Sequence, residues 1–110
     1  MNGIDILKNQ SDFKKIYSKG KSSGRKYVVL LVLKNNLSYN RKAFVASKKV
    51  GNSIKRHRAV RLMRESYRLM ESDFKQGYDL LFIARNTITD RKCADVKKSI
   101  EAAAKRAGIL

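Results

Sequence analysis

The first apolar pattern along the chain has the spacing of a helix. Phe13, Ile16 and Tyr17 recur at intervals of three and one, which places them on one helical face. Ser11 is an acceptable N-cap, so the helix is predicted to begin there. Gly20 is expected to end it in the left-handed conformation that glycine adopts readily.

The pattern then changes to that of β-strands. Residues 26–33 are a nearly continuous apolar run, which is typical of a strand buried on both faces. Residues 42–47 predict a second strand, paired with the first as a hairpin through the polar loop at 35–40. Segment 21–25 is either a turn or a short edge strand. A further strand is predicted at 78–84, directly after a glycine.

Two amphipathic helices complete the chain. The first begins after Asn52 and is predicted to end near Gly77, because apolar residues recur there at intervals of three and four. These residues are Val60, Met63, Tyr67, Met70 and Phe74. The same period returns over residues 96–103, after a polar loop around Thr89 and Asp90, and predicts the last helix.

This order of elements predicts one α+β domain that spans residues 1–110. Helices are expected on one side of a sheet, in a two-layer sandwich, and neither proline nor a linker interrupts the elements. Strand 42–47, the long helix and strand 78–84 form a β-α-β unit. The general rule makes the crossover of such a unit right-handed.

The charge of the chain indicates what kind of partner the protein binds. It has 26 Lys and Arg residues against 9 Asp and Glu, a formal net charge of +17. No acid lies between Asp12 and Glu65, a stretch that holds 16 of the 26 basic residues. Such a field attracts a polyanion. Nucleic acid is favoured over an acidic membrane, because the basic residues do not oppose one continuous exposed apolar stripe.

Several classes of protein are disfavoured by what the sequence contains. The longest apolar run, residues 27–33, is far shorter than the roughly 20 residues of a membrane-spanning helix, so a cytoplasmic protein without a membrane partner is expected. Cys93 is the sole cysteine and His57 the sole histidine, so neither a disulfide within the chain nor a zinc site is expected. Without a carboxylate cluster, the chain also lacks the groups of a self-sufficient nuclease, and no catalytic residue is assigned.

The long helix is predicted to carry an arginine-rich face. At about 100° per residue, Arg61, Arg64 and Arg68 fall on one stripe with Arg58 beside them, away from the apolar stripe. Guanidinium groups bind phosphate oxygens in a bidentate manner and remain charged. The alternative is an ordinary solvated helix face, but such faces mix Glu with the basic residues, and here only Glu65 interrupts.

The residues around the start of this helix resemble a known family. Lys48-Lys-Val-Gly-Asn52, Arg56-His-Arg58, Arg61 and Arg64-Glu65 are similar to the signature of the bacterial ribonuclease P protein component. The aromatic first helix and the strand that leads to Arg85 resemble family elements in the right order. The sequence departs from the family pattern at His57, where Asn is usual, and at Val60, where Lys is usual.

The resemblance implies a fold and a function. The fold is a four-stranded sandwich with the order α-β-β-β-α-β-α and a left-handed β-α-β crossover, like the second domain of a small-subunit ribosomal protein. The function is that of a protein subunit that binds the catalytic RNA and the 5′ leader of precursor tRNA. The RNA hydrolyses the substrate with magnesium ions, so no cofactor on the protein itself and no obligate protein partner are expected.

The resemblance also assigns roles to individual residues. Those expected to face the catalytic RNA are Lys48, Arg56, Arg58, Arg61, Arg64 and Arg68. Those expected to line the leader cleft are Phe13, Tyr17, Tyr27, Lys49 and Arg85. Aromatic rings between basic side chains stack on any base, which suits leaders of variable sequence. Phe13 and Tyr17 could instead anchor the first helix to the core, and the whole chain could be a ribosomal or other structural RNA-binding protein.

Overall fold

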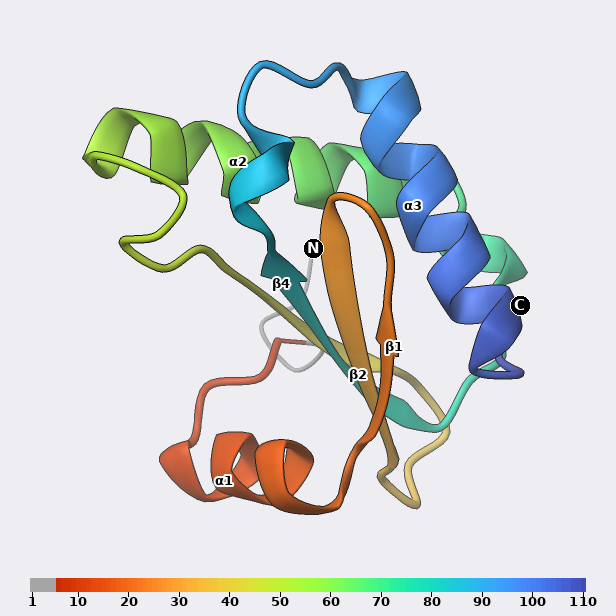
Figure 1. The fold of residues 1–110 in the computed structure, drawn as a ribbon. Coiled ribbons are helices and arrows are strands. Elements are labelled where there is room, and N and C mark those ends of the chain that lie inside the picture. The colour runs from red at the N-terminus through yellow and green to blue at the C-terminus, as the bar shows by residue number, and fades with distance from the viewer. Residues whose placement is uncertain (1–5) are drawn as a thin grey trace.

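A computed structural model describes residues 6–110 as a mixed sheet with three α-helices (Figure 1). The α+β sandwich predicted from the sequence is confirmed. The helices are α1 (Gln10–Lys19), α2 (Ser53–Arg68) and α3 (Cys93–Arg106), with short 3-10 turns η2 (Glu71–Asp73) and η3 (Asn86–Ile88). The strands are β1 (Lys21–Gly24), β2 (Val28–Lys34), β3 (Arg41–Val45) and β4 (Tyr78–Ala84).

The strands are ordered β1-β2-β4-β3, with β3 parallel to β4 and the other pairs antiparallel. The predicted hairpin between residues 26–33 and 42–47 is therefore wrong, because β4 lies between these two strands. The burial pattern gives the reason. β4 is apolar on both faces and takes a central place, whereas β3 begins with Arg41 and Lys42 and forms an edge.

The sheet has a helix-covered core on each face. α2 and α3 cover one face, where Leu30, Phe82 and Ile100 are fully buried. α1 covers part of the other face, where Ile16 packs on Leu81, and it lies on the far side of the sheet from α2 in Figure 1. The prediction that all helices share one side is wrong for α1. Because β2 and β4 are apolar on both faces, the second face of the sheet must also be shielded from water, and α1 does this in part.

An aromatic cluster sets the position of α2 over the sheet. The ring of Phe44 on β3 stacks on Phe82 of β4 at a centroid distance of 5.0 Å. Tyr67 of α2 packs on Phe82 at 5.1 Å and meets Phe74 edge to face at 5.0 Å. Such pairs contribute about 0.5–1.5 kcal/mol each beyond the burial of their area. The cluster thereby fixes which side of α2 faces solvent.

The long helix is shorter than predicted. α2 ends at Arg68, and the chain continues through η2 rather than as a helix to Gly77. Met70 and Phe74 are buried as their spacing predicts, but they are placed by the 3-10 turn. Ser72 and Asp73 are poor helix formers, and the turn lets Phe74 reach the Tyr67 ring.

The first helix also differs at its ends. Its N-cap is Asn9 and not Ser11, two residues earlier than predicted. Gly20 follows its last residue with a φ of −69° and a ψ of 148°, so the predicted left-handed stop is wrong. The glycine is needed for another reason, because a Cβ there would lie 2.4 Å from the carbonyl oxygen of Ile16.

The β3-α2-β4 unit joins two neighbouring parallel strands, as a β-α-β unit requires. The left-handed crossover stays an expectation from the family resemblance. Over residues 6–110, no helix combines the length and apolar character needed to span a bilayer.

Candidate nucleic-acid interface

Helix α2 presents one buried and one basic face, as predicted. Ala59, Met63 and Tyr67 are almost completely buried against the sheet and α3. Arginines occupy the exposed side and the helix start, with only Arg56 half-buried. The exposed ones are Arg58, Arg61, Arg64 and Arg68.

Few of these arginines are engaged by acids of the same chain. Arg68 pairs with Glu65 at 2.8 Å, and Arg64 lies 5.9 Å from the centroid of the Phe44 ring. Arg58 donates from Nη2 to the Arg91 carbonyl oxygen at 2.8 Å. Within residues 6–110, Arg61 makes neither an ion pair nor a hydrogen bond. The arginine face therefore keeps most of its charge available.

The single acid on this face is partly neutralised by its neighbour. The hydrogen bond from Arg68 lowers the pKa of Glu65, and the same bond raises the pKa of Arg68. Both groups are exposed, so the pair contributes little to the stability of the fold.

The start of α2 is suited to binding anions, although the basic residues there do not stabilise the helix. Asn52 caps the helix by accepting a hydrogen bond from the Lys55 amide at 3.0 Å, and no acid lies in the first turn. Lys48 and Lys49 are exposed in the turn just before it. Cations at a helix N-terminus oppose the helix dipole, whereas phosphates bind well there. Arg56 adds a buried Nε atom without a hydrogen-bond partner within residues 6–110.

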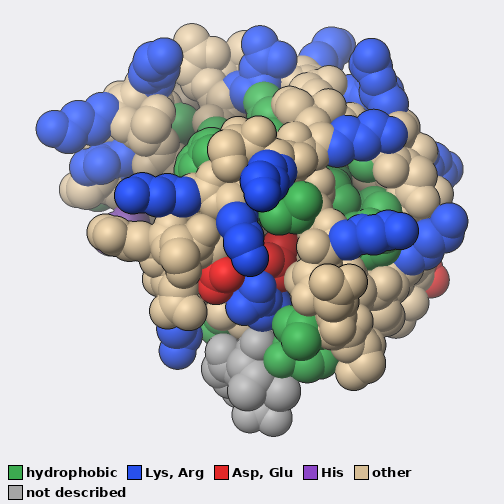
Figure 2. Space-filling model, turned by 90° about the horizontal axis from the view of Figure 1, so that it is seen from below, with side chains coloured by type: hydrophobic (Ala, Val, Ile, Leu, Met, Phe, Trp, Pro, Cys, Tyr) green, Lys and Arg blue, Asp and Glu red, His purple; other side chains and the backbone are tan. Residues whose placement is uncertain are grey.

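The basic character extends beyond α2. Seen from below in Figure 2, Lys and Arg side chains are spread over the face, whereas acidic groups are few and most of their visible surface lies near the centre. Because the positive charge is not confined to one stripe, RNA could contact more than one element.

A second candidate surface is the part of the sheet that α1 leaves uncovered. Leu31, Leu81 and Ala43 are paired across β2, β4 and β3 and are buried in the core under α1. Two residues further along, Val29, Ile83 and Val45 form the next row on the same face, and each is only half-buried. We call this row, Val29-Ile83-Val45, the floor residues. Its Val45 end lines an open cleft of about 690 Å³ beside α1, which Phe13 and the α2 residues Arg64 and Arg68 also line.

Phe13 and Tyr17 of α1 lie on a different side of the helix from Asp12, and Phe13 lines this cleft. Asp12 pairs with Arg41 at 3.3 Å. At about 100° per residue, Phe13 and Tyr17 lie about 100° and 140° around the helix from Asp12. Phe13 is half-buried and lines a groove with Val45, whereas Tyr17 is 57% exposed. Ile16 is the fully buried anchor of the helix.

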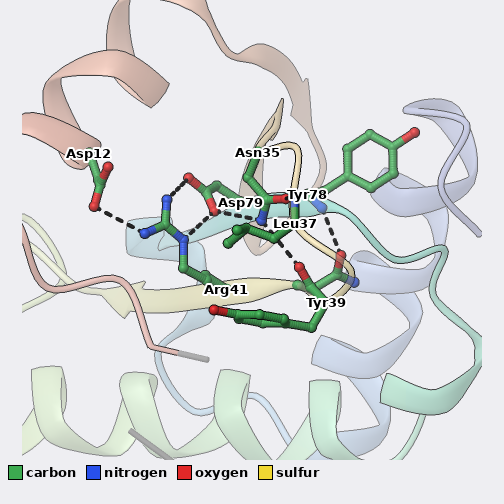
Figure 3. A network of polar contacts seen from close by, with 8 residues as sticks. Asp12, Asn35, Leu37, Tyr39, Arg41, Tyr78 and Asp79 are labelled. Atoms are coloured by element: carbon green, nitrogen blue, oxygen red, sulfur yellow. Dashed lines mark hydrogen bonds and ion pairs between the residues drawn. The ribbon is translucent and has the colours of Figure 1, made fainter. Parts of the chain in front are cut away.

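The position of α1 is fixed by a polar network at the far end of the sheet (Figure 3). Arg41 binds Asp79 through two hydrogen bonds, of 2.8 and 2.7 Å, and also contacts Asp12 of α1. Asn35 donates to the same Asp79 carboxylate at 3.0 Å. Figure 3 shows these side chains converging from α1, β3, β4 and the loop after β2.

Three further residues were predicted to line the leader cleft. Lys49 and Arg85 follow the parallel strands β3 and β4, so both lie at the sheet end that α1 leaves open, and both are exposed. Tyr27 does not join them. It packs against the α2 and α3 core, with the Arg91 guanidinium 5.4 Å from its ring centroid.

Comparisons with known proteins by sequence and by fold point to one family. A family profile described as "Ribonuclease P" matches residues 1–108. The ribonuclease P protein component of Clostridioides difficile is 46% identical over 104 residues, which cover 94% of this chain and 91% of that protein. The chain belongs to the ribonuclease P protein family. It is thus a subunit of ribonuclease P, a ribonucleoprotein endoribonuclease, and works with ribonuclease P RNA.

Solved structures of ribonuclease P proteins share the fold. The Staphylococcus aureus ribonuclease P protein superimposes with a TM-score of 0.84 at 28% identity, covering 96% of each chain. The protein from Thermotoga maritima gives a TM-score of 0.82 at 28% identity, covering 91% of this chain and 94% of that one. The family, rather than a ribosomal protein, therefore accounts for the basic α+β fold.

The two departures from the ribonuclease P signature occupy different environments. His57 is exposed near the start of α2, between Arg56 and Arg58. Val60 is half-buried and packs against the core. A valine at that position adds apolar contact at the edge of the buried face, and the exposed arginines supply the charge.

Sequence analysis missed several residues of the two surfaces. The floor residues Val29, Ile83 and Val45 gave no local signal, because their exposure depends on where α1 ends. Arg91 approaches Tyr27 from a distant part of the chain. Among residues 6–110, no three His, Cys, Asp or Glu side chains are grouped so as to hold a metal ion.

Proposed function

We propose that the exposed basic face of α2 binds ribonuclease P RNA and that the open cleft beside α1 binds the 5′ leader of precursor tRNA. The observation that carries the proposal is the exposure of Arg58, Arg61, Arg64 and Arg68 on a face with one acid. Among the described residues only Arg68 of these four has an acidic partner, Glu65, and exposed guanidinium groups without one gain most from a polyanion.

The geometry of α2 suits an RNA backbone. Successive turns of the helix rise by about 5.4 Å, which is close to the separation of neighbouring phosphates. Arg61, Arg64 and Arg68 can therefore contact successive phosphates of a folded RNA, whose shape is recognised through its backbone. Lys48 and Arg56 extend this surface at the helix start, where the dipole also favours anions.

The cleft beside α1 has the features of a single-strand site. Phe13 and Val45 line it, and we expect the exposed Tyr17 ring and the half-buried floor residues Val29 and Ile83 to extend it. Lys49 and Arg85 lie at its open end. Rings and apolar surface contact bases of any sequence while the cations contact the backbone. Tyr27 lies with α3 and is best regarded as a contact outside this cleft.

The proposal leaves hydrolysis of precursor tRNA to the RNA subunit and its magnesium ions. The protein assists by holding the RNA subunit on one surface and the leader on another. Membership of a ribonucleoprotein family supports this division of roles.

The α2 assignment is tested by the salt dependence of binding to ribonuclease P RNA. Arg61→Ala and Arg64→Ala are each expected to weaken binding and to lower the slope of log affinity against log salt by about one. Arg106→Ala removes the same charge from the last turn of α3 and serves as the matched control. It should leave the slope nearly unchanged.

Two outcomes would contradict the assignment. One is an equal slope of log affinity against log salt for all three variants. The arginines of α2 would then contribute only through the net charge of the protein and not through direct phosphate contacts. The other is tight binding to ribosomal RNA fragments with none to ribonuclease P RNA, which would favour a structural RNA-binding role.

A further inference from the structure

The exposed side of α2 carries large aliphatic side chains that phosphate binding does not use. Ile54 on the first turn is 77% exposed, and Leu69, just after the last turn, is 58% exposed. Leu62 lies between them in sequence and is half-buried. Residues 54, 58, 61, 62, 65 and 69 all fall on the solvent side of the helix, opposite Met63 and Tyr67. This face is thus apolar as well as basic.

Two of these side chains, Ile54 and Leu62, border a groove between α2 and the start of α3. Its volume is about 500 Å³, and it is lined by Ile54, Arg58, Arg61, Leu62, Glu65 and Cys93. That volume lies within the range of sites that accept small organic molecules. A planar group the size of a nucleobase can enter it.

The charges around the groove decide what kind of partner fits. Arg58 is held in place by the Arg91 carbonyl, and Arg61 has no partner within residues 6–110. The charge of Glu65 is offset by Arg68. A second copy of the chain would bring two arginine faces and two net charges of +17 together. An anionic partner with a flat apolar part, a nucleotide, satisfies both the charges and the aliphatic walls.

We propose that this groove receives one unpaired base of ribonuclease P RNA. The base packs between Ile54 and Leu62, and the phosphates on either side of it bind Arg58 and Arg61. The inference rests on the proposed function, in which α2 faces the RNA, and it adds a base contact to the phosphate contacts. Unpaired bases in loops and bulges are the parts of RNA that proteins bind through base faces.

The salt dependence of binding distinguishes the apolar contribution to this contact from the electrostatic contribution. Ile54→Ala is expected to weaken binding to ribonuclease P RNA by about tenfold, since the isoleucine is buried only in the complex. The slope of log affinity against log salt should stay at the wild-type value, because no charge is lost. Leu37→Ala removes another exposed aliphatic side chain, from the loop after β2, and should bind like the wild type.

A second measurement reports on the groove itself. Cys93 is the sole cysteine of the chain and lines the groove. Its alkylation by iodoacetamide should slow several-fold when ribonuclease P RNA is bound. A fully paired RNA duplex, bound to the same occupancy at low salt, should slow it much less, because the duplex offers no unpaired base.

The outcomes distinguish the base site from the broader function. Wild-type affinity for Ile54→Ala, together with a reduced salt slope for Arg61→Ala, overturns the base site and retains the RNA-binding face. Wild-type behaviour of both variants overturns the proposed function as well. If Ile54→Ala leaves RNA binding intact but abolishes self-association in sedimentation velocity, the groove is a contact between copies of the chain.

Discussion

Arg41 on β3 and Asp79 on β4 are joined by two parallel hydrogen bonds, Nε to Oδ1 at 2.8 Å and Nη2 to Oδ2 at 2.7 Å. The side chain of Asp79 is only 6% exposed and that of Arg41 23% exposed. The hydrogen bond with Asp79 raises the pKa of Arg41, so the guanidinium stays protonated. Through Asp12, the pair also holds α1 over one end of the sheet, which leaves the other end open.

Loss of the Asp79 carboxylate should therefore destabilise the fold markedly. Asp79→Ala leaves Arg41 with only its longer contact to Asp12 and removes one acceptor from Asn35. Breaking a largely buried pair of this kind costs about 3–5 kcal/mol. Asp12→Ala removes a single, longer contact at 3.3 Å and should cost less than about 1 kcal/mol. Urea unfolding followed by circular dichroism measures both. Equal losses for the two variants would contradict the view that Asp79 is the centre of the network.

The elements that could be predicted from the sequence are those with strong local signals. The strand at 78–84 matches β4, and Asn52 caps α2 as its position predicts. The arginine face of α2 followed from helical spacing alone, because one helix determines both its buried and its exposed stripe. No partner from elsewhere in the chain was needed to locate it.

The features that could not be predicted depend on contacts between distant residues. Strands 26–33 and 42–47 carry no signal that β4 will separate them, since pairing is decided by burial on both faces. Placement of α1 on the second face depends on Ile16 packing against distant strand residues such as Leu81, with the Arg41–Asp12 contact, 29 residues apart, as an addition. Tyr27 lies just before β2, and its ring packs with Arg91 near α3.

Gly20 offers a test of the close approach that ends α1. Gly20→Ala should destabilise the protein by about 1–3 kcal/mol, because its Cβ would lie 2.4 Å from the Ile16 carbonyl oxygen. Gly24→Ala is the control, since the nearest atom to a Cβ there is Val29 Cγ2 at 3.9 Å. Thermal unfolding should separate the two variants by several degrees. A Gly20 variant as stable as the Gly24 variant would mean that α1 shifts at little cost.

A role of Tyr17 and Phe13 in leader binding can be distinguished by experiment from a role in anchoring α1 to the core. Tyr17 is 57% exposed, so Tyr17→Ala should leave unfolding unchanged while lowering affinity for precursor tRNA about 5- to 100-fold in the reconstituted holoenzyme. Affinity for mature tRNA, which has no leader, should not change. Phe13→Ala should show the same selectivity together with some loss of stability, because Phe13 is half-buried. Equal losses for precursor and mature tRNA would assign both rings to the core alone.

Glu65 is expected to limit the RNA affinity of α2. It places a negative charge among the arginines and forms an ion pair with Arg68 at 2.8 Å, so Glu65→Gln should raise affinity for ribonuclease P RNA by about threefold at low salt.

In the wild type the pKa of Glu65 lies below its ordinary value of 4.5, because the carboxylate accepts a hydrogen bond from Arg68. Arg68→Ala should return it toward 4.5, measured by NMR titration of the side-chain carboxyl.

The sign of the pH effect follows from that lowered pKa. The Glu65-Arg68 contact is present above the unfolded pKa of the carboxyl and is lost as pH falls through the folded one. Acid therefore removes a negative charge from the α2 face and releases Arg68 for phosphate. RNA affinity of the wild type should rise relative to Glu65→Gln as pH falls through that range, until the two proteins bind alike. Parallel pH profiles for the two proteins would show that Glu65 lies outside the RNA contact.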